Sequence, residues 1–89
     1  MRNTTTGPGE AAAEQESAER LVLELCRDVL HRREATLEDG FTELGGSSLT
    51  ASQLLHLIQE RTGIRIPAPA LFRAQNLREV ARLLTDRDV

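Results

Sequence analysis

The chain has 89 residues, a formal net charge of −3 and a single cysteine. This length corresponds to one domain with a small core, which leaves no room for a substrate cavity of enzyme size. Acidic and basic residues are interspersed, so the charge pattern favours neither a nucleic acid nor an anionic membrane as partner. All eleven basic residues are arginine, which excludes lysine-based phosphate loops, Schiff bases and lysine nucleophiles.

The N-terminal sequence and the cysteine content bear on the compartment. The first residues, MRNTTTGPG, contain no apolar h-region, and no apolar run exceeds a few residues, so we expect neither a signal peptide nor a membrane span. Cys26 excludes an internal disulfide and suits a reducing compartment. We therefore expect a cytoplasmic protein, and nothing in the sequence demands more than a monomer.

The N-terminal third predicts a tail followed by a helix. Residues 1–16 are expected to form a disordered tail, although residues 10–19 hold strong helix formers that either extend the helix or fray. Ser17 is the expected N-cap. From about residue 18, apolar residues recur on one broad helical face, with Cys26 as a core residue: Leu21, Val22, Leu25, Cys26, Val29 and Leu30.

Residues 34–47 are predicted to form a long loop, because they lack the alternation of a β-hairpin. A loop of this length in a small domain is usually functional. Gly40, Gly45 and Gly46 indicate positive φ or a close backbone approach. Three apolar residues are spaced to anchor the loop in the core, while its acidic residues stay in solvent: Leu37, Phe41 and Leu44, against Glu38, Asp39 and Glu43.

The second helix is predicted from Ser48 to Arg61 or Thr62, with Gly63 as the C′ residue. Leu49 lies almost opposite its apolar face and Leu57 lies to one side, so both are candidates for an exposed docking surface. Packing of Leu57 on another helix is an equally good interpretation.

Two further helices complete the predicted core. Pro69 falls near the first turn of a short helix, where proline is tolerated. Asn76 is the expected cap of a last helix, whose apolar stripe is Leu77, Val80, Ala81 and Leu84. The fold class is therefore all-α, a small antiparallel bundle with three main helices and one short helix. We expect the folded domain to span residues 17–86 and residues 87–89 to fray.

Catalytic and metal sites find no support in the sequence. Residues 45–49 lack the closing glycine of a nucleophile elbow. His31 and His56 occupy polar helical positions, and one cysteine with two distant histidines makes no zinc site. The acidic residues of the loop match no calcium-loop spacing. We predict no catalytic residue and no metal.

Ser48 is the candidate functional residue. A serine after glycine at a helix start is most often an N-cap. However, only one of Ser47 and Ser48 is needed as the cap, which leaves one hydroxyl spare. Gly45 and Gly46 also remove bulk where a large cofactor would approach. A phosphodiester on the spare hydroxyl would lie against the free N–H groups and the positive dipole end of the second helix.

The segment DGFTELGGSSL, residues 39–49, resembles the core motif of the peptidyl carrier (thiolation) proteins of non-ribosomal peptide synthesis, D-x-F-F-x-L-G-G-x-S-L. The similarity continues through residues 61–67 and 70–72 to about Leu84, and so covers residues 18–85. Thr42 replaces the second phenylalanine of the motif, and Thr62 stands where an aromatic residue is common. In that family the serine receives a 4′-phosphopantetheine arm. The match places this role on Ser48, with Gly45, Gly46, Ser47 and Leu49 flanking it.

The resemblance implies an acyl-carrier-like bundle that carries a tethered group and does not itself catalyse a reaction. A phosphopantetheinyl transferase would join the arm, taken from coenzyme A, to Ser48. An adenylation enzyme would load an aminoacyl or peptidyl group onto the arm as a thioester. Condensation or tailoring enzymes would then act in trans, because the chain reads as a free-standing carrier. The second helix is nearly neutral, so we expect docking through Leu49, Leu57 and residues 71–73, with Phe72 itself in the core.

Two other interpretations stay open at this point. An acyl carrier protein of polyketide or fatty-acid type shares the bundle and the arm, but usually shows L-G-x-D-S-L. Two glycines after Leu44 and no aspartate before Ser48 favour the peptidyl type. The other interpretation is an unmodified helical interaction module in which Ser48 only caps a helix.

Overall fold

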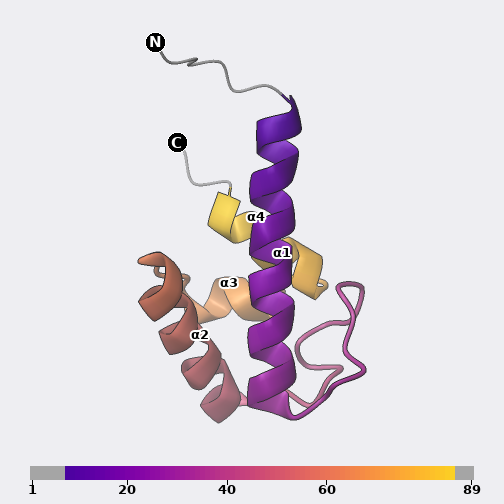
Figure 1. Ribbon diagram of the computed structural model, residues 1–89. Helices are drawn as coiled ribbons and strands as arrows, with labels where there is room; N and C mark the ends of the chain where they lie inside the picture. Colours follow the sequence, from indigo (N-terminus) through magenta and orange to yellow (C-terminus); the bar gives the residue numbers. More distant parts are fainter. Residues whose placement is uncertain (1–7, 86–89) are drawn as a thin grey trace.

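A computed structural model describes the backbone of residues 8–85 and the side chains of residues 13–85. This part of the chain forms four helices and no strand: α1 (Pro8–Leu30), α2 (Ser48–Thr62), α3 (Ala68–Arg73) and α4 (Leu77–Thr85). α1 packs against α2 and α4, and α2 packs against α3. Figure 1 shows α2 running back beside α1, while α4 crosses α1. The predicted all-α bundle with three main helices and one short helix is confirmed.

One apolar cluster joins the four helices and the long loop. Cys26 on α1 and Leu54 and Ile58 on α2 are 0% exposed, as are Leu71 on α3 and Leu77 on α4. The loop inserts Phe41 and Leu44 into the same cluster and packs Leu37, which is partly buried, against it, which confirms the three apolar anchors. Burial of side chains this large is the main stabilising contribution in so small a domain. None of the helices in the described range is long and apolar enough to cross a membrane.

The ends of α2, α3 and α4 lie where the sequence predicts them. Gly63 ends α2 in the left-handed region, with φ 76°. Pro69 lies in the first turn of α3. Asn76 Oδ1 accepts a hydrogen bond from the backbone N–H of Glu79 at 2.9 Å and so caps α4. Each of these boundaries comes from a local signal that the residue itself carries.

α1 begins earlier than the sequence predicts. It starts at Pro8, so Ser17 is exposed inside the helix and the expected N-cap at Ser17 is wrong. Residues 8–16, assigned to the tail, are helical because good helix formers continue the helix without an apolar stripe. Residues 1–7 and 87–89 lie outside the described residues, and the domain boundaries 17–86 stay a prediction.

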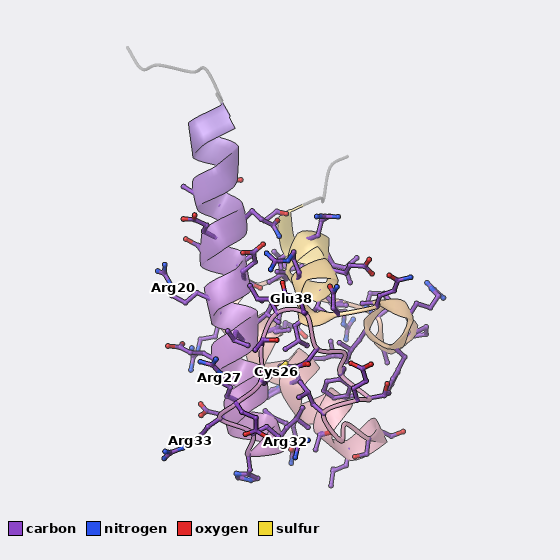
Figure 2. All side chains as sticks on the ribbon, turned by 90° about the vertical axis from the view of Figure 1, so that its right-hand side faces the viewer. Arg20, Cys26, Arg27, Arg32, Arg33 and Glu38 are labelled. Atoms are coloured by element: carbon purple, nitrogen blue, oxygen red, sulfur yellow. The ribbon has the colours of Figure 1, made fainter. Side chains whose placement is uncertain are left out.

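Polar contacts fasten the N-terminal half of α1 to α4. Thr85 Oγ1 donates a hydrogen bond to Gln15 Oε1 at 2.8 Å, across 70 residues of sequence. Arg78 pairs with Glu19 at 3.4 Å and also with Glu38 of the loop. Both carboxylates favour the charged form of Arg78 and raise its pKa, with Glu38 as the larger cause. Figure 2 shows Arg20 on α1 and Arg33, just after the end of α1, pointing away from the bundle.

Leu57 on α2 is half-buried and packs against the core, which agrees with the interpretation that it contacts another helix.

Cys26 is fully buried, as predicted, and Figure 2 shows it between α1 and the other helices. Burial raises the pKa of its thiol from 9.0 to about 12, so the thiol stays protonated at neutral pH. Such a thiol is a poor nucleophile, which supports a purely structural role.

Candidate attachment site

The first part of the loop that leads to the candidate serine is held by hydrogen bonds from α1 and α4. At its start, Arg27 Nε and Nη2 donate hydrogen bonds to the carbonyl oxygen of Ala35 at 3.2 and 2.8 Å. Further along, the backbone N–H groups of Leu77 and Arg78 donate to the carbonyl oxygens of Asp39 (2.9 Å) and Leu37 (3.0 Å). The first turn of α4 thus obtains partners from the loop, and the loop obtains a fixed path.

Two glycines turn the chain from this loop into α2. Gly45 has φ +95°, a left-handed conformation that side chains rarely adopt. A Cβ on Gly46 would lie 2.3 Å from the ring of Phe41, so the ring occupies the space that Gly46 leaves free. The sequence indicates a close approach at this pair. The structure adds that the group approaching Gly46 belongs to the protein itself.

Phe72 extends this aromatic contact to α3. Its ring meets the ring of Phe41 edge to face, with centroids 5.8 Å apart and planes at 72°. Phe72 is nevertheless 41% exposed, so the expectation that it lies in the core is wrong. Phe41 is buried, whereas Phe72 lies at the rim of the core, where its ring contacts that of Phe41. Gly46, Phe41 and Phe72 therefore connect the start of α2 to α3.

Ser47 is the residue that caps α2. Its Oγ accepts a hydrogen bond from the backbone N–H of Thr50 at 3.4 Å, and Thr50 Oγ1 accepts one from the N–H of Ser47 at 2.8 Å. This reciprocal pair is a capping box. Thr50, three residues after Ser47, stands where Glu or Gln usually completes such a box, so the spacing is the signal in the sequence that points to Ser47 as the cap. The choice between Ser47 and Ser48 as the cap is thereby decided for Ser47.

Ser48 is the first residue of α2 and is exposed to solvent. Within the described part of the chain its hydroxyl makes no hydrogen bond, in contrast to the hydroxyl of Ser47. The backbone N–H groups of Ser48 and Leu49 also have no acceptor among the described residues. An available hydroxyl beside two free N–H groups at a helix N-terminus fits a phosphodiester on Ser48 Oγ.

The other predicted site residues lie together around Ser48. Leu49 is 68% exposed, the highest value for a large apolar side chain in the described range, which confirms its predicted exposure. Roles for Gly45, Gly46, Ser47 and Leu49 in binding a cofactor or partner stay predictions. A groove of about 480 Å³ also begins at Ser48 and runs between α2 and α3, and nothing in the sequence analysis anticipates it. Among the described residues, no group of three or more His, Cys, Asp or Glu side chains could hold a metal ion.

Comparisons with known proteins agree with this geometry. Residues 20–84 match the family model described as "Phosphopantetheine attachment site". The chain is 30% identical over 81 residues to bacitracin synthase 1 of Bacillus licheniformis, covering 91% of this chain and 2% of that protein. It is 34% identical over 76 residues to surfactin synthase subunit 1 of Bacillus subtilis (strain 168), covering 85% of this chain and 2% of that protein.

The name of a third relative states the kind of synthesis. The dimodular nonribosomal peptide synthase of Bacillus subtilis (strain 168) is 33% identical over 79 residues, covering 89% of this chain and 3% of that protein. The chain thus spans only a small part of the length of the relatives that it matches. No solved structure matches significantly. The family match covers most of the chain, so the chain belongs to the phosphopantetheine attachment site family, as a carrier domain of the nonribosomal peptide synthase type rather than an enzyme, with 4′-phosphopantetheine as its covalent cofactor.

Proposed function

We propose that this protein carries an aminoacyl or peptidyl group on a phosphopantetheine arm attached to Ser48 Oγ. One observation carries the choice of residue: Ser47 caps α2, so the hydroxyl of Ser48 is exposed and available. When bound, the arm supplies a terminal thiol that holds the cargo as a thioester. The names of the relatives support the peptidyl type over a polyketide or fatty-acid type.

The residues around Ser48 have distinct tasks in this proposal. Gly45 and Gly46 turn the chain, and Ser47 fixes the first turn of α2, so that Ser48 is presented in one defined orientation. The N–H groups of Ser48 and Leu49 face the phosphate and, with the helix dipole, stabilise its negative charge. In this proposal no residue of the chain transfers a proton, because a carrier only positions its cargo and other enzymes carry out the reactions.

Intact-mass measurement after incubation with coenzyme A and a permissive phosphopantetheinyl transferase tests the attachment residue. The wild-type protein is expected to gain the mass of one arm, and Ser48→Ala is expected to gain none. Ser47→Ala is the matched control: it removes the neighbouring hydroxyl but keeps Ser48, so it is expected to accept the arm. An unmodified wild type, or an arm that survives Ser48→Ala, would refute the assignment.

We infer that the partners are a phosphopantetheinyl transferase, an adenylation enzyme and condensation or tailoring enzymes, which meet in the cytoplasm. Leu49 is the proposed contact, because its side chain is exposed beside Ser48 and α2 begins with no acidic residue in its first turn. Leu49→Ala is expected to lower the rates of arm transfer and loading about tenfold, the size of a loss of about 1.4 kcal/mol of contact energy.

Gln53→Ala is the control for the docking surface. Gln53 is also exposed on α2, and its truncation removes a polar side chain instead of an apolar one. We expect its arm-transfer and loading rates to stay close to those of the wild type. Equal rates for Leu49→Ala and the wild type would show that apolar docking at Leu49 is wrong, while attachment at Ser48 would stand.

A further inference from the structure

A second groove lies at the end of the bundle opposite to Ser48, and we call it the distal groove. It has a volume of about 520 Å³. One wall is α1, from Ala13 to Leu21, and the facing wall comes from the ends of α2 and α4. From Ser48 to Thr62 the axis of α2 rises about 21 Å, at 1.5 Å per residue. A molecule bound in the distal groove would therefore leave Ser48 accessible.

The distal groove follows from the early start of α1. This helix has 23 residues and α2 has 15, so α1 is longer by about 12 Å, at 1.5 Å per residue. Figure 1 shows the first turns of α1 projecting beyond the ends of α2 and α4. The groove lies in the step between the projecting helix and the ends of the two shorter helices.

The walls of the distal groove are mainly apolar. Thr62 Oγ1 donates a hydrogen bond to the carbonyl oxygen of Ile58 at 2.7 Å and accepts one from the N–H of Ile64 at 3.0 Å. Thr85 Oγ1 donates to Gln15 Oε1 at 2.8 Å. Both wall hydroxyls are thus bonded within the protein. A ligand would gain chiefly by covering the five alkyl side chains of the walls, which are Ala13, Ala18, Leu21, Ile64 and Leu84.

The backbone around the groove favours a helical ligand over an extended one. An extended peptide binds by pairing its backbone with a free sheet edge, whereas a helix bonds its own backbone groups internally along its length. The N–H of Ile64, which follows α2, is already bonded to Thr62 Oγ1. An amphipathic helix satisfies its own backbone and lays its apolar face into such a groove. The ligand that fits is therefore an amphipathic helix.

The charge around the distal groove is negative. Glu14 is the one charged residue among the described residues that line it, and it forms no ion pair in that part of the chain. Because α2 ends at Thr62 and α4 ends at Thr85, the negative ends of two helix dipoles lie at the groove. Residues 8–19 of α1 contain four glutamates and no basic residue. The ligand should therefore carry basic side chains beside its apolar face.

The same charges argue against a second copy of this chain as the ligand. Two copies that met at their distal grooves would bring Glu14 and two helix C-termini of one copy against those of the other, and like charges repel. Arg61 and Arg82, in the last turns of α2 and α4, do not line the groove and so provide no matching contact inside it. A basic partner fits the groove better than self-association does.

We propose that the distal groove binds a basic amphipathic helix of a partner protein. The apolar face of that helix supplies affinity, and its basic side chains set its orientation. Binding needs no arm on Ser48. A partner held at this end of the domain stays attached while other enzymes act on the arm, and such a tether raises its effective concentration without a tight contact at Ser48.

Titration with a model helix tests this inference. The probe is a peptide of about twenty residues with leucine at every third or fourth position and lysine beside the leucines. A matched peptide has glutamine in place of lysine. Nuclear magnetic resonance of the full chain is expected to show amide shifts at Ser17, Ile64 and Thr85 and none at Ser48. The lysine peptide is expected to bind about two- to fivefold more tightly than the glutamine peptide.

A steric block identifies the groove as the binding site. Ser17→Trp places a large side chain on the α1 wall, and Ser52→Trp makes the same change at an exposed position of α2 outside the distal groove. Ser17→Trp is expected to weaken the binding of both peptides about tenfold, and Ser52→Trp is expected to leave it unchanged. Both positions are exposed, and urea unfolding of the two variants checks that the fold is kept.

The preference for a basic partner is tested on α1 itself. Glu14→Gln is expected to bind the lysine peptide about two- to fivefold more weakly and the glutamine peptide as before. Glu24→Gln is the matched control, because Glu24 is exposed on the same helix and does not line the groove. Raising the salt from about 0.1 M to about 1 M shortens the Debye length from about 10 Å to about 3 Å and should remove most of the difference between the peptides.

Each contrary result has its own meaning. No saturable binding of either peptide up to about 1 mM, or equal binding by Ser17→Trp and the wild type, would overturn the groove. Equal dissociation constants for the two peptides would overturn the basic partner. Self-association of the protein that Ser17→Trp abolishes would assign the groove to a second copy. Tighter peptide binding after removal of residues 86–89 would assign it to the end of this chain. Failure of arm attachment at Ser48 would refute the proposed function and leave this inference standing.

Discussion

The N-termini of α2 and α4 are built alike and surrounded differently. Each helix has a polar side chain as its cap, Ser47 for α2 and Asn76 for α4. In α4, the next two N–H groups donate to the carbonyl oxygens of Asp39 and Leu37. In α2, the corresponding N–H groups of Ser48 and Leu49 have no acceptor among the described residues.

This difference separates a helix start with a structural role from the helix start at which we propose that the arm is attached. The free N–H groups of a first turn need partners, from the protein, from water or from a ligand. The long loop supplies these partners to α4, whose first residue, Leu77, is completely buried. At α2 the same groups stay open beside an exposed hydroxyl. Substitutions at the two helix starts should therefore separate loss of stability from loss of function.

The largest expected effect is the truncation of Leu77. Leu77→Ala removes a fully buried side chain and is expected to lower the free energy of unfolding by about 2–5 kcal/mol. The matched change at the start of α2 is Leu49→Ala, and a side chain that is 68% exposed should cost at most about 0.5 kcal/mol. Urea unfolding of both variants measures the difference. Equal losses would break the distinction between the two helix starts.

A smaller effect is expected at the turn into α2. Gly46→Ala places a Cβ against the ring of Phe41 and is expected to cost about 1–3 kcal/mol through overpacking. Because the ring moves with this Cβ, the edge contact between Phe41 and Phe72 should also change, and arm transfer to Ser48 should slow. Urea unfolding and the transfer rate together check this. A variant that matches the wild type in both would show that the ring has room to shift.

Much of the fold can be predicted from local signals. Gly63 and Asn76 mark helix boundaries through their own conformational and capping preferences, and Phe41 and Leu44 mark the anchors of the loop through their spacing. The start of α1 could not be predicted in this way. Its early turns lack an apolar stripe, and one of the contacts that fastens them, from Thr85 to Gln15, joins residues 70 positions apart.

In the candidate site, too, local features could be predicted from the sequence and tertiary features could not. Ser48 can be picked out from the motif, because the pattern of glycines, serines and leucine is local. The partner of Gly46 and the exposure of Phe72 could not be predicted, since both depend on how α3 and the loop meet. The groove at Ser48 is also a tertiary feature: its two sides come from α2 and from the chain that folds back over it.

The smallest expected effect distinguishes the two serines. Ser47→Ala removes the capping oxygen of α2 and is expected to cost about 1 kcal/mol of stability. Ser48→Ala removes a hydroxyl with no partner among the described residues and should leave the free energy of unfolding unchanged within about 0.5 kcal/mol. Measured by urea unfolding of the unmodified protein, the order of the two losses should be opposite to the order of their effects on arm attachment. A larger loss of stability for Ser48→Ala would mean that Ser48 is the cap, and the open hydroxyl would then have to be sought at Ser47.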